Sequence, residues 1–187
     1  MALTALDPTT ALVLIDLQKG IVGMLPGDES APLVARAAAL AKAFRRHGLP
    51  VVLVNVAGGS PGRVEQRPNL ADLPPDWTEI IPELDPQESD HRVTKRSWGA
   101  FTNTHLDAHL REHGVTQIVL AGIATSVGVE STARFAHELG YNLTFARDAM
   151  ADRFAEAHQY SLTRIFPRLG EIGTSAEIVA LLDRGHA

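Results

Sequence analysis

Ala11-Leu-Val-Leu-Ile-Asp16 is a short apolar run that ends in an acid, and Pro50-Val-Val-Leu-Val-Asn-Val56 is a second apolar run. Such runs are typical of parallel strands that are buried on both faces of a sheet. Between them, residues 32–47 carry apolar side chains at helical spacing, and Gly48 is of a type that commonly ends a helix. The order strand, helix, strand predicts a right-handed βαβ unit, the building block of an α/β fold.

The rest of the chain continues this alternation of strand-like and helix-like segments. Further strands are expected at residues 91–95, 117–121, 141–146 and 171–173, and helices at 104–113, 126–139, 155–169 and 175–183. Alternation of this kind predicts a parallel sheet with helices on both faces. Residues 57–92 break the pattern because they are rich in glycine and proline. We expect them to form a long surface excursion that is docked by Trp77, Ile80, Ile81 and Leu84.

The length and composition of the chain exclude several classes of protein. The chain has 187 residues, a net charge of −5 and no cysteine, and we expect one domain spanning residues 1–187. The acidic balance argues against nucleic acid as a partner, and no apolar run is long enough to cross a membrane. The first residues lack the features of a signal peptide, so a cytoplasmic location is expected. Without cysteine, disulfides and thiol catalysis are excluded.

Three features fall at the edge of the predicted sheet where ligands bind. In open parallel α/β sheets this edge is formed by the carboxyl ends of the strands. Asp16 ends the first strand, Lys95 ends the strand 91–95, and the turn 122–128 follows the strand 117–121. Each feature alone has a plain structural interpretation, as a loop cap, a solvated lysine, or a turn for packing or anion binding. Together they predict one site, because the fold directs all three to the same place.

Residues 11–18, 95–101 and 120–134 resemble the three signature segments of the isochorismatase-like hydrolase family, which is part of the cysteine hydrolase superfamily. This family includes nicotinamidases, pyrazinamidases, N-carbamoyl amidohydrolases and isochorismatases. The resemblance implies a Rossmann-like, three-layer α/β domain with a six-stranded, mainly parallel sheet. It also implies that the chain is a hydrolase with a small-molecule substrate.

Most members of this family carry a catalytic Asp, Lys and Cys. Asp16 and Lys95 occupy the first two positions, and Gly128 stands where the cysteine would be. The covalent thiolate mechanism is therefore excluded. The chain is similar in this respect to the isochorismatase branch, which also lacks the cysteine and cleaves a vinyl ether with the aspartate as an acid.

The resemblance also implies how a substrate is held. The backbone N–H groups of Ala124 and Gly128 would face a developing oxyanion, and a cis peptide bond would precede Ala124. Isochorismatases use an arginine for the substrate carboxylates, and its counterpart here is Arg67 or Arg63.

An apolar wall of the pocket is predicted from position in the chain. Ile21, Trp98 and Phe101 are apolar and lie close in sequence to the polar site residues. Trp98 has the alternative of packing in the core or at a subunit contact. Because family members commonly assemble, and because the segment from Trp98 to Phe101 is apolar, we expect a homo-oligomer.

No metal or other cofactor is expected. The metal-binding nicotinamidases carry Asp-x-His after the second strand, whereas residues 55–60 read Asn-Val-Ala-Gly-Gly-Ser. His105, His109 and His113 have the i, i+4 spacing of a metal-ligand pair. The charged residues among them favour a solvated helix face instead.

Three functions remain open at this point. The first is a cysteine-free hydrolase of a small organic acid or vinyl ether, with Asp16 in acid–base catalysis and Lys95 in support. The second is an amidase or esterase in which Asp16 activates water, or in which Ser126 substitutes as the nucleophile. The third is a non-catalytic small-molecule binder that has lost the cysteine.

Overall fold

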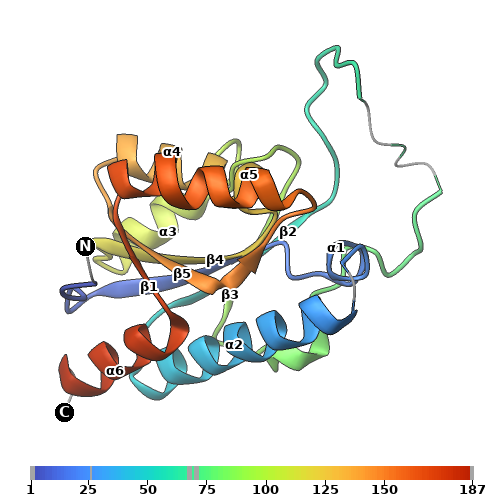
Figure 1. Ribbon diagram of the computed structural model, residues 1–187. Coiled ribbons are helices and arrows are strands. Elements are labelled where there is room, and N and C mark those ends of the chain that lie inside the picture. Colours follow the sequence, from blue (N-terminus) through green and yellow to red (C-terminus); the bar gives the residue numbers. More distant parts are fainter. Residues whose placement is uncertain (1–2, 26, 67–68, 70–71, 186–187) are drawn as a thin grey trace.

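The computed structural model describes residues 3–25, 27–66, 69 and 72–185. Strands and helices alternate along this chain (Figure 1). The strands are β1 (Thr10–Ile15), β2 (Val51–Val56), β3 (His91–Lys95), β4 (Gln117–Ile123), β5 (Asn142–Ala151) and β6 (Glu171–Gly173). The helices are α1 (Lys19–Val22), α2 (Gly27–Arg46), α3 (Leu106–Glu112), α4 (Glu130–Glu138), α5 (Ala155–Tyr160) and α6 (Ser175–Gly185).

The strands form a single sheet in the order β3-β2-β1-β4-β5-β6, and every neighbouring pair is parallel. The expected six-stranded parallel sheet is therefore confirmed. Helices α2 and α6 cover one face of the sheet, and α3, α4 and α5 cover the other (Figure 1). The strand order reverses at β1, which has β2 on one side and β4 on the other. Sheets of this type bind ligands beside the carboxyl ends of the two strands at that point.

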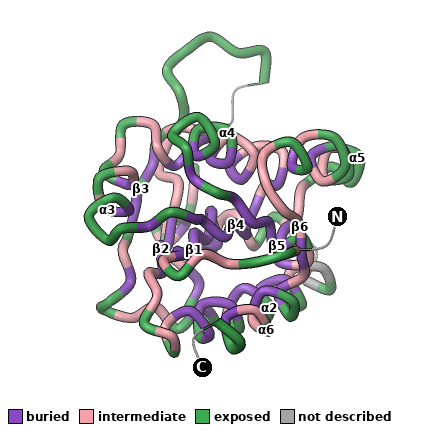
Figure 2. Tube along the Cα trace, turned by 90° about the vertical axis from the view of Figure 1, so that its left-hand side faces the viewer, coloured by how far each residue is buried: buried purple, intermediate pink, exposed green. Residues whose placement is uncertain are grey.

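The side chains of β1 pack alternately on the two faces of the sheet. Leu12 and Leu14 belong to the core that includes α2, whereas Val13 and Ile15 belong to the core that includes α4. Every residue of β1 is buried, as expected for a central strand that is covered on both faces. Figure 2 shows the buried sheet between two helical layers whose outer surfaces are exposed. None of the helices in the described part of the chain has the length and apolar character needed to span a membrane.

Strand β5 is longer than the sequence predicts. It continues to Ala151 rather than ending at residue 146, and its register against β4 shifts between Leu120 and Gly122. The shift accommodates extra residues of β5, among them the polar pair Arg147 and Asp148. Because these two residues interrupt the apolar run, the sequence pattern does not predict the part of β5 beyond residue 146.

Two predicted helices begin or end in other helical forms. The predicted helix 126–139 starts as a π-helical turn at Thr125–Val129 before α4 begins. The predicted helix 155–169 divides into α5, a π-helical turn at Ser161–Ile165 and a 3-10 turn at Phe166–Arg168. The last of these contains Pro167, whose missing N–H disfavours a continuous α-helix.

The excursion after β2 returns to the body through apolar residues. In Figure 1 the described residues that follow β2 project away from the sheet, and the segment around Trp77 lies beside α1. Trp77, Ile81 and Leu84 are buried, and Ile80 forms an isolated antiparallel bridge with Gln18. The predicted docking of the excursion by these apolar residues is confirmed. The returning segment therefore lies next to the carboxyl end of β1.

Candidate active site

Asp16 is turned out of the sheet by its backbone conformation. It follows β1 with a left-handed φ of 53°, a conformation that Asp adopts more readily than most residues. Its N–H donates to the carbonyl oxygen of Val54 at 2.9 Å. On the other side of β1, Gly122 has a φ of 123°, and a Cβ there would collide with the backbone of Ile15. Glycine at this position lets β4 approach the end of β1.

Asp16 and Lys95 form a buried ion pair. The Lys95 Nζ lies 2.8 Å from Asp16 Oδ2, and the two side chains are only 2% and 8% exposed. Lys95 also donates to the carbonyl oxygen of Ser97 at 3.2 Å. Asp16 Oδ1 is buried and has no hydrogen-bond partner among the described residues. Both residues stand at the carboxyl ends of their strands, as the sequence predicts.

The surroundings of Asp16 act on its pKa in opposite senses. Burial raises the pKa of the Asp16 carboxyl to about 6, while the charge and the hydrogen bond of Lys95 lower it. The net shift of the pKa is upward because burial disfavours the charged carboxylate more than one ammonium group favours it. A carboxyl with this pKa exchanges its proton close to neutral pH, which is what a general acid or base requires.

Gly128 brings the π-helical turn up against this pair. A Cβ at position 128 would lie 3.1 Å from Asp16 Oδ2 and 2.9 Å from Ile15 Cγ2. The missing side chain therefore leaves room for the Asp16 carboxyl to lie beside the turn. The peptide bond between Ile123 and Ala124 is cis, as the family resemblance implies.

A cavity of about 630 Å³ opens onto the pair. Among its lining residues are six of the predicted ones: Asp16, Ile21, Lys95, Trp98, Ala124 and Gly128. Most of the remaining wall is apolar and comes from Met24, Leu25, Val56, Leu73, Trp77 and Val127. The cavity thus combines an apolar body with a small number of polar groups, as small-molecule sites commonly do.

The predicted wall residue Phe101 lies elsewhere. Its ring is 6.1 Å from the ring of Tyr141, and it packs against the core on the α4 side. The N–H of Ala100 donates to Thr132 Oγ1 at 3.0 Å, which holds the segment against α4 and directs the next residue away from the cavity. Arg67 falls outside the described residues, and Arg63 is exposed and is not among the residues that line the cavity.

The cavity also contains residues that sequence reasoning did not find. Arg153 lines it, and its guanidinium carbon is 5.5 Å from the centroid of the Phe154 ring. Trp77 was expected to dock the excursion, but it also lines the cavity. Arg153 lies two residues beyond the end of β5 at Ala151, so its position near a strand end is a usable signal. That signal is lost when β5 is predicted to end at residue 146.

Ser126, the substitute nucleophile of one hypothesis, faces a different hollow beside α5. Its hydroxyl donates to Asp152 Oδ2 at 2.7 Å. It is not among the residues that line the Asp16 cavity. This placement argues against Ser126 as a nucleophile for a substrate bound beside Asp16.

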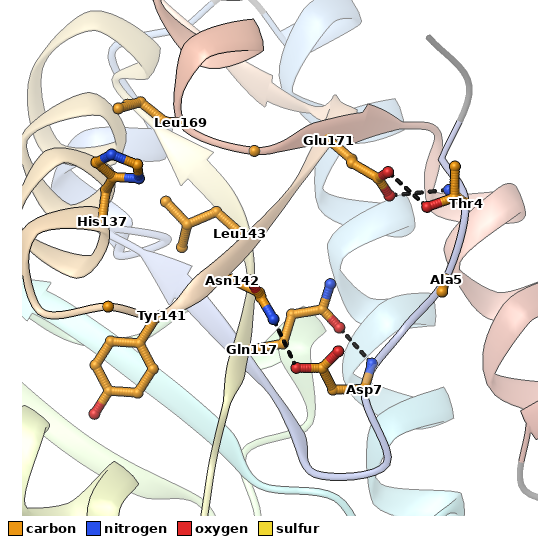
Figure 3. Close-up of a pocket in the computed structure, with 12 residues that line it drawn as sticks. Thr4, Ala5, Asp7, Gln117, His137, Tyr141, Asn142, Leu143, Leu169 and Glu171 are labelled. Atoms are coloured by element: carbon orange, nitrogen blue, oxygen red, sulfur yellow. Dashed lines mark hydrogen bonds between the residues drawn. The ribbon is translucent and has the colours of Figure 1, made fainter.

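Another hollow, of about 460 Å³, lies at the amino ends of the strands, opposite the Asp16 cavity (Figure 3). It is lined by residues that begin strands, among them Gln117, Asn142 and Glu171. These side chains are satisfied within the protein: Asn142 donates to Asp7 at 3.0 Å, and Glu171 accepts from Thr4 at 2.6 Å. These side chains thus already have partners, whereas Asp16 Oδ1 in the other cavity has none among the described residues. Among the described residues, no group of three or more His, Asp or Glu residues is placed to hold a metal ion.

Comparison with known proteins finds relatives over most of the chain. Residues 10–177 match the family model described as the isochorismatase domain. The sequence is 46% identical over 177 residues to the isochorismatase family protein YwoC of Bacillus subtilis (strain 168), with 91% of this chain and 92% of YwoC covered. It is 43% identical over 182 residues to YecD of Escherichia coli O157:H7, with coverages of 93% and 96%. The solved structure of an isochorismatase family protein from Burkholderia thailandensis matches with a TM-score of 0.90 at 44% identity, covering 96% of this chain and 98% of that one.

Proposed function

This chain belongs to the isochorismatase family and is one of its hydrolases, and on that premise we propose that Asp16 is the acid in the hydrolysis of a small organic acid or vinyl ether. The supporting observation is the buried contact of Asp16 with Lys95 beside Gly128. The site thus has an acid, Asp16, and a cationic partner, Lys95, although the chain has no thiol. A mechanism without a covalent intermediate needs no more than these groups and water.

The proposed reaction begins with transfer of the Asp16 proton to the terminal carbon of a vinyl ether. The substrate becomes an oxygen-stabilised cation, and the carboxylate left on Asp16 is stabilised by the Lys95 ammonium group. Water then adds to the cationic carbon and returns a proton to the carboxylate. The resulting hemiketal breaks its C–O bond to give a ketone and an alcohol, so no bond to the protein forms.

The lining of the cavity supports a substrate with an apolar body and an anionic group. Ile21, Leu25 and Val127 provide apolar surface, and Arg153, a cationic residue, lines the same cavity. Arginine binds carboxylates with two parallel hydrogen bonds, which fixes orientation as well as charge. We therefore assign to Arg153 the contact with a substrate carboxylate that the family resemblance gave to Arg67 or Arg63.

Assembly into a homo-oligomer is part of the same proposal. Trp98 is 64% exposed and Phe135 is 50% exposed. Phe135 lies beside the residue that follows Trp98, because a Cβ at Gly99 would lie 3.5 Å from Phe135 Cδ2. Exposed aromatic residues that cluster in this way mark contact surfaces. An assembly through them would place the partner beside the cavity that Trp98 lines.

The test compares the wild-type protein with Asp16→Asn on isochorismate, on simple vinyl ether carboxylates, and on small amides and esters. Each carboxylated ether is paired with its methyl ester, which lacks the charge that Arg153 would bind. We expect release of a ketone from the carboxylated ethers and a loss of about 100-fold or more in Asp16→Asn. Circular dichroism serves as the control for folding. Turnover by Asp16→Asn at the wild-type rate would contradict the acid–base role.

The pH dependence distinguishes the acid from the base. A general acid must be protonated, so kcat/KM is expected to fall as the pH rises through about 6, the pKa of Asp16. A water-activating amidase or esterase needs the carboxylate, so its kcat/KM would rise over the same range. Tight binding of the carboxylated ethers without any turnover would instead support the non-catalytic binder.

A further inference from the structure

The π-helical turn that carries Gly128 is held by two side chains from beyond β5. The N–H and the hydroxyl of Ser126 both donate to Asp152 Oδ2, each at 2.7 Å. One residue earlier, Thr125 Oγ1 lies 2.8 Å from His158 Nδ1. Neither Asp152 nor His158 is among the residues that line the Asp16 cavity, and both contact the turn that carries Gly128.

Both contacts satisfy groups that the turn would otherwise leave without a partner. The first N–H groups of a helical segment have no acceptor within it, and Asp152 accepts from Ser126 at this end, where a negative charge is favourable. Thr125 is fully buried, so its hydroxyl needs a partner inside the protein. Burial lowers the pKa of His158, while the charge of Asp152 raises it. The net lowering favours the neutral imidazole at neutral pH, which can donate to or accept from this hydroxyl.

The position of the turn determines how closely Asp16 is enclosed. A Cβ on Gly128 would be 3.1 Å from Asp16 Oδ2, so the backbone of the turn forms one wall around the carboxyl. Burial is also the largest cause of the raised pKa of Asp16. If the turn moved outward, water would reach the carboxyl and its pKa would fall toward the ordinary value.

We propose that Asp152 and His158 are positioning residues, which hold the turn against Asp16 through Ser126 and Thr125. Their importance for catalysis rests on the proposed function of Asp16. Their effect on the enclosure of Asp16 does not, because it can be measured without any substrate. Neither side chain lines the cavity, and we expect loss of either contact to change the site by releasing the turn.

The experiment is a pH titration of the Asp16 carboxyl by NMR in protein labelled with 13C-aspartate, with the signal assigned through Asp16→Asn. The disruptive variants are Asp152→Ala and Thr125→Val, which remove the acceptor of Ser126 and the hydroxyl that His158 contacts. The matched controls are Asp152→Asn, which keeps an acceptor oxygen, and Thr125→Ser, which keeps the hydroxyl. Thr125→Val is nearly isosteric, so it provides the test if Asp152→Ala does not fold.

We expect the midpoint of Asp16 to fall from its wild-type value toward 3.8 in the disruptive variants and to return in the matched controls. With an identified substrate, kcat should fall about tenfold or more with little change in KM, because misplacement of a site affects the chemical step. A folded disruptive variant with the wild-type midpoint would overturn the inference. If the midpoint moves while vinyl ethers are not hydrolysed, the positioning role stands and the proposed reaction fails.

Discussion

Among single residues, Gly128 determines how much space there is beside the Asp16 carboxyl, because it has no side chain. Any substitution places a Cβ 2.9 Å from Ile15 Cγ2 and 3.1 Å from Asp16 Oδ2. The ends of those two side chains would have to shift by a few tenths of an ångström. The Asp16 carboxylate therefore lies directly beside the place where a side chain at position 128 would begin.

Replacement of Gly128 is predicted to lower activity. We expect Gly128→Cys to reduce kcat/KM on the native substrate about tenfold, which corresponds to about 1.4 kcal/mol of transition-state stabilisation. Gly128→Ala is the matched control, since it adds the same Cβ without a thiol and should cause a similar loss. Steady-state kinetics on both variants, with simple amides as second substrates, provide the measurement. If Gly128→Cys alone gained amide hydrolysis and kept its native activity, the chain would instead be one that has lost a cysteine nucleophile while keeping the rest of the site.

At the scale of elements, β3, α3 and the residue that caps α3 bring three histidines together. The rings of His91 and His109 are stacked with centroids 3.5 Å apart, and the ring of His113 lies 4.2 Å from that of His109. Burial lowers the pKa of His91, and the charge of His113 lowers it further. Burial also lowers the pKa of His109, as do the charges of His91 and His113, while Glu112 raises it. Protonation of neighbouring rings is thus disfavoured in the folded protein.

This histidine cluster is expected to make stability depend on pH. Because the pKa values are lower in the folded state, the unfolded chain takes up protons first as the pH falls below 6.5, the ordinary histidine value. The free energy of unfolding should therefore decrease from about pH 6.5 downward and level off once the folded protein is also protonated. The measurement is urea unfolding of the wild type and of His109→Gln at a series of pH values between 7.5 and 5. Asp16 contributes the opposite slope in both proteins and cancels in the difference. Equal slopes would contradict the role of the cluster.

The elements that sequence reasoning located are those whose pattern is apolar and regular. β1, β2 and β4 are buried along most of their length and end at the residues that carry the site, so Asp16 and the turn 122–128 follow from the strand ends. The sequence predicts too short a strand for β5, because Arg147 and Asp148 interrupt its apolar pattern. The position of Arg153 near the end of β5 is therefore not predicted either. Phe101 was misplaced because its direction depends on a tertiary hydrogen bond, from Ala100 to Thr132. No local pattern encodes that bond.

For the whole molecule, we predict assembly through the surface around Trp98 and Phe135. Sedimentation velocity at micromolar concentration is expected to show a species larger than the monomer. Phe135→Glu is the informative variant, because Phe135 lies on α4 and is not among the residues that line the Asp16 cavity. A buried charge at a subunit contact is costly, so this variant should sediment as a monomer. A monomeric wild-type protein under these conditions would rule out the assembly.

The absence of cysteine has a further consequence for the conditions under which the enzyme works. Relatives that depend on a thiolate are exposed to peroxides and alkylating agents, because the reactive form of the nucleophile is also the form that is oxidised. A site built on a carboxyl, an ammonium group and a glycine offers no such target. Met24, which lines the cavity and is 68% exposed, is of a type that oxidants convert to the sulfoxide. Oxidation of Met24 would therefore alter the polarity of the cavity wall in a way that is enzymatically reversible, and would leave the side chains of Asp16 and Lys95 intact.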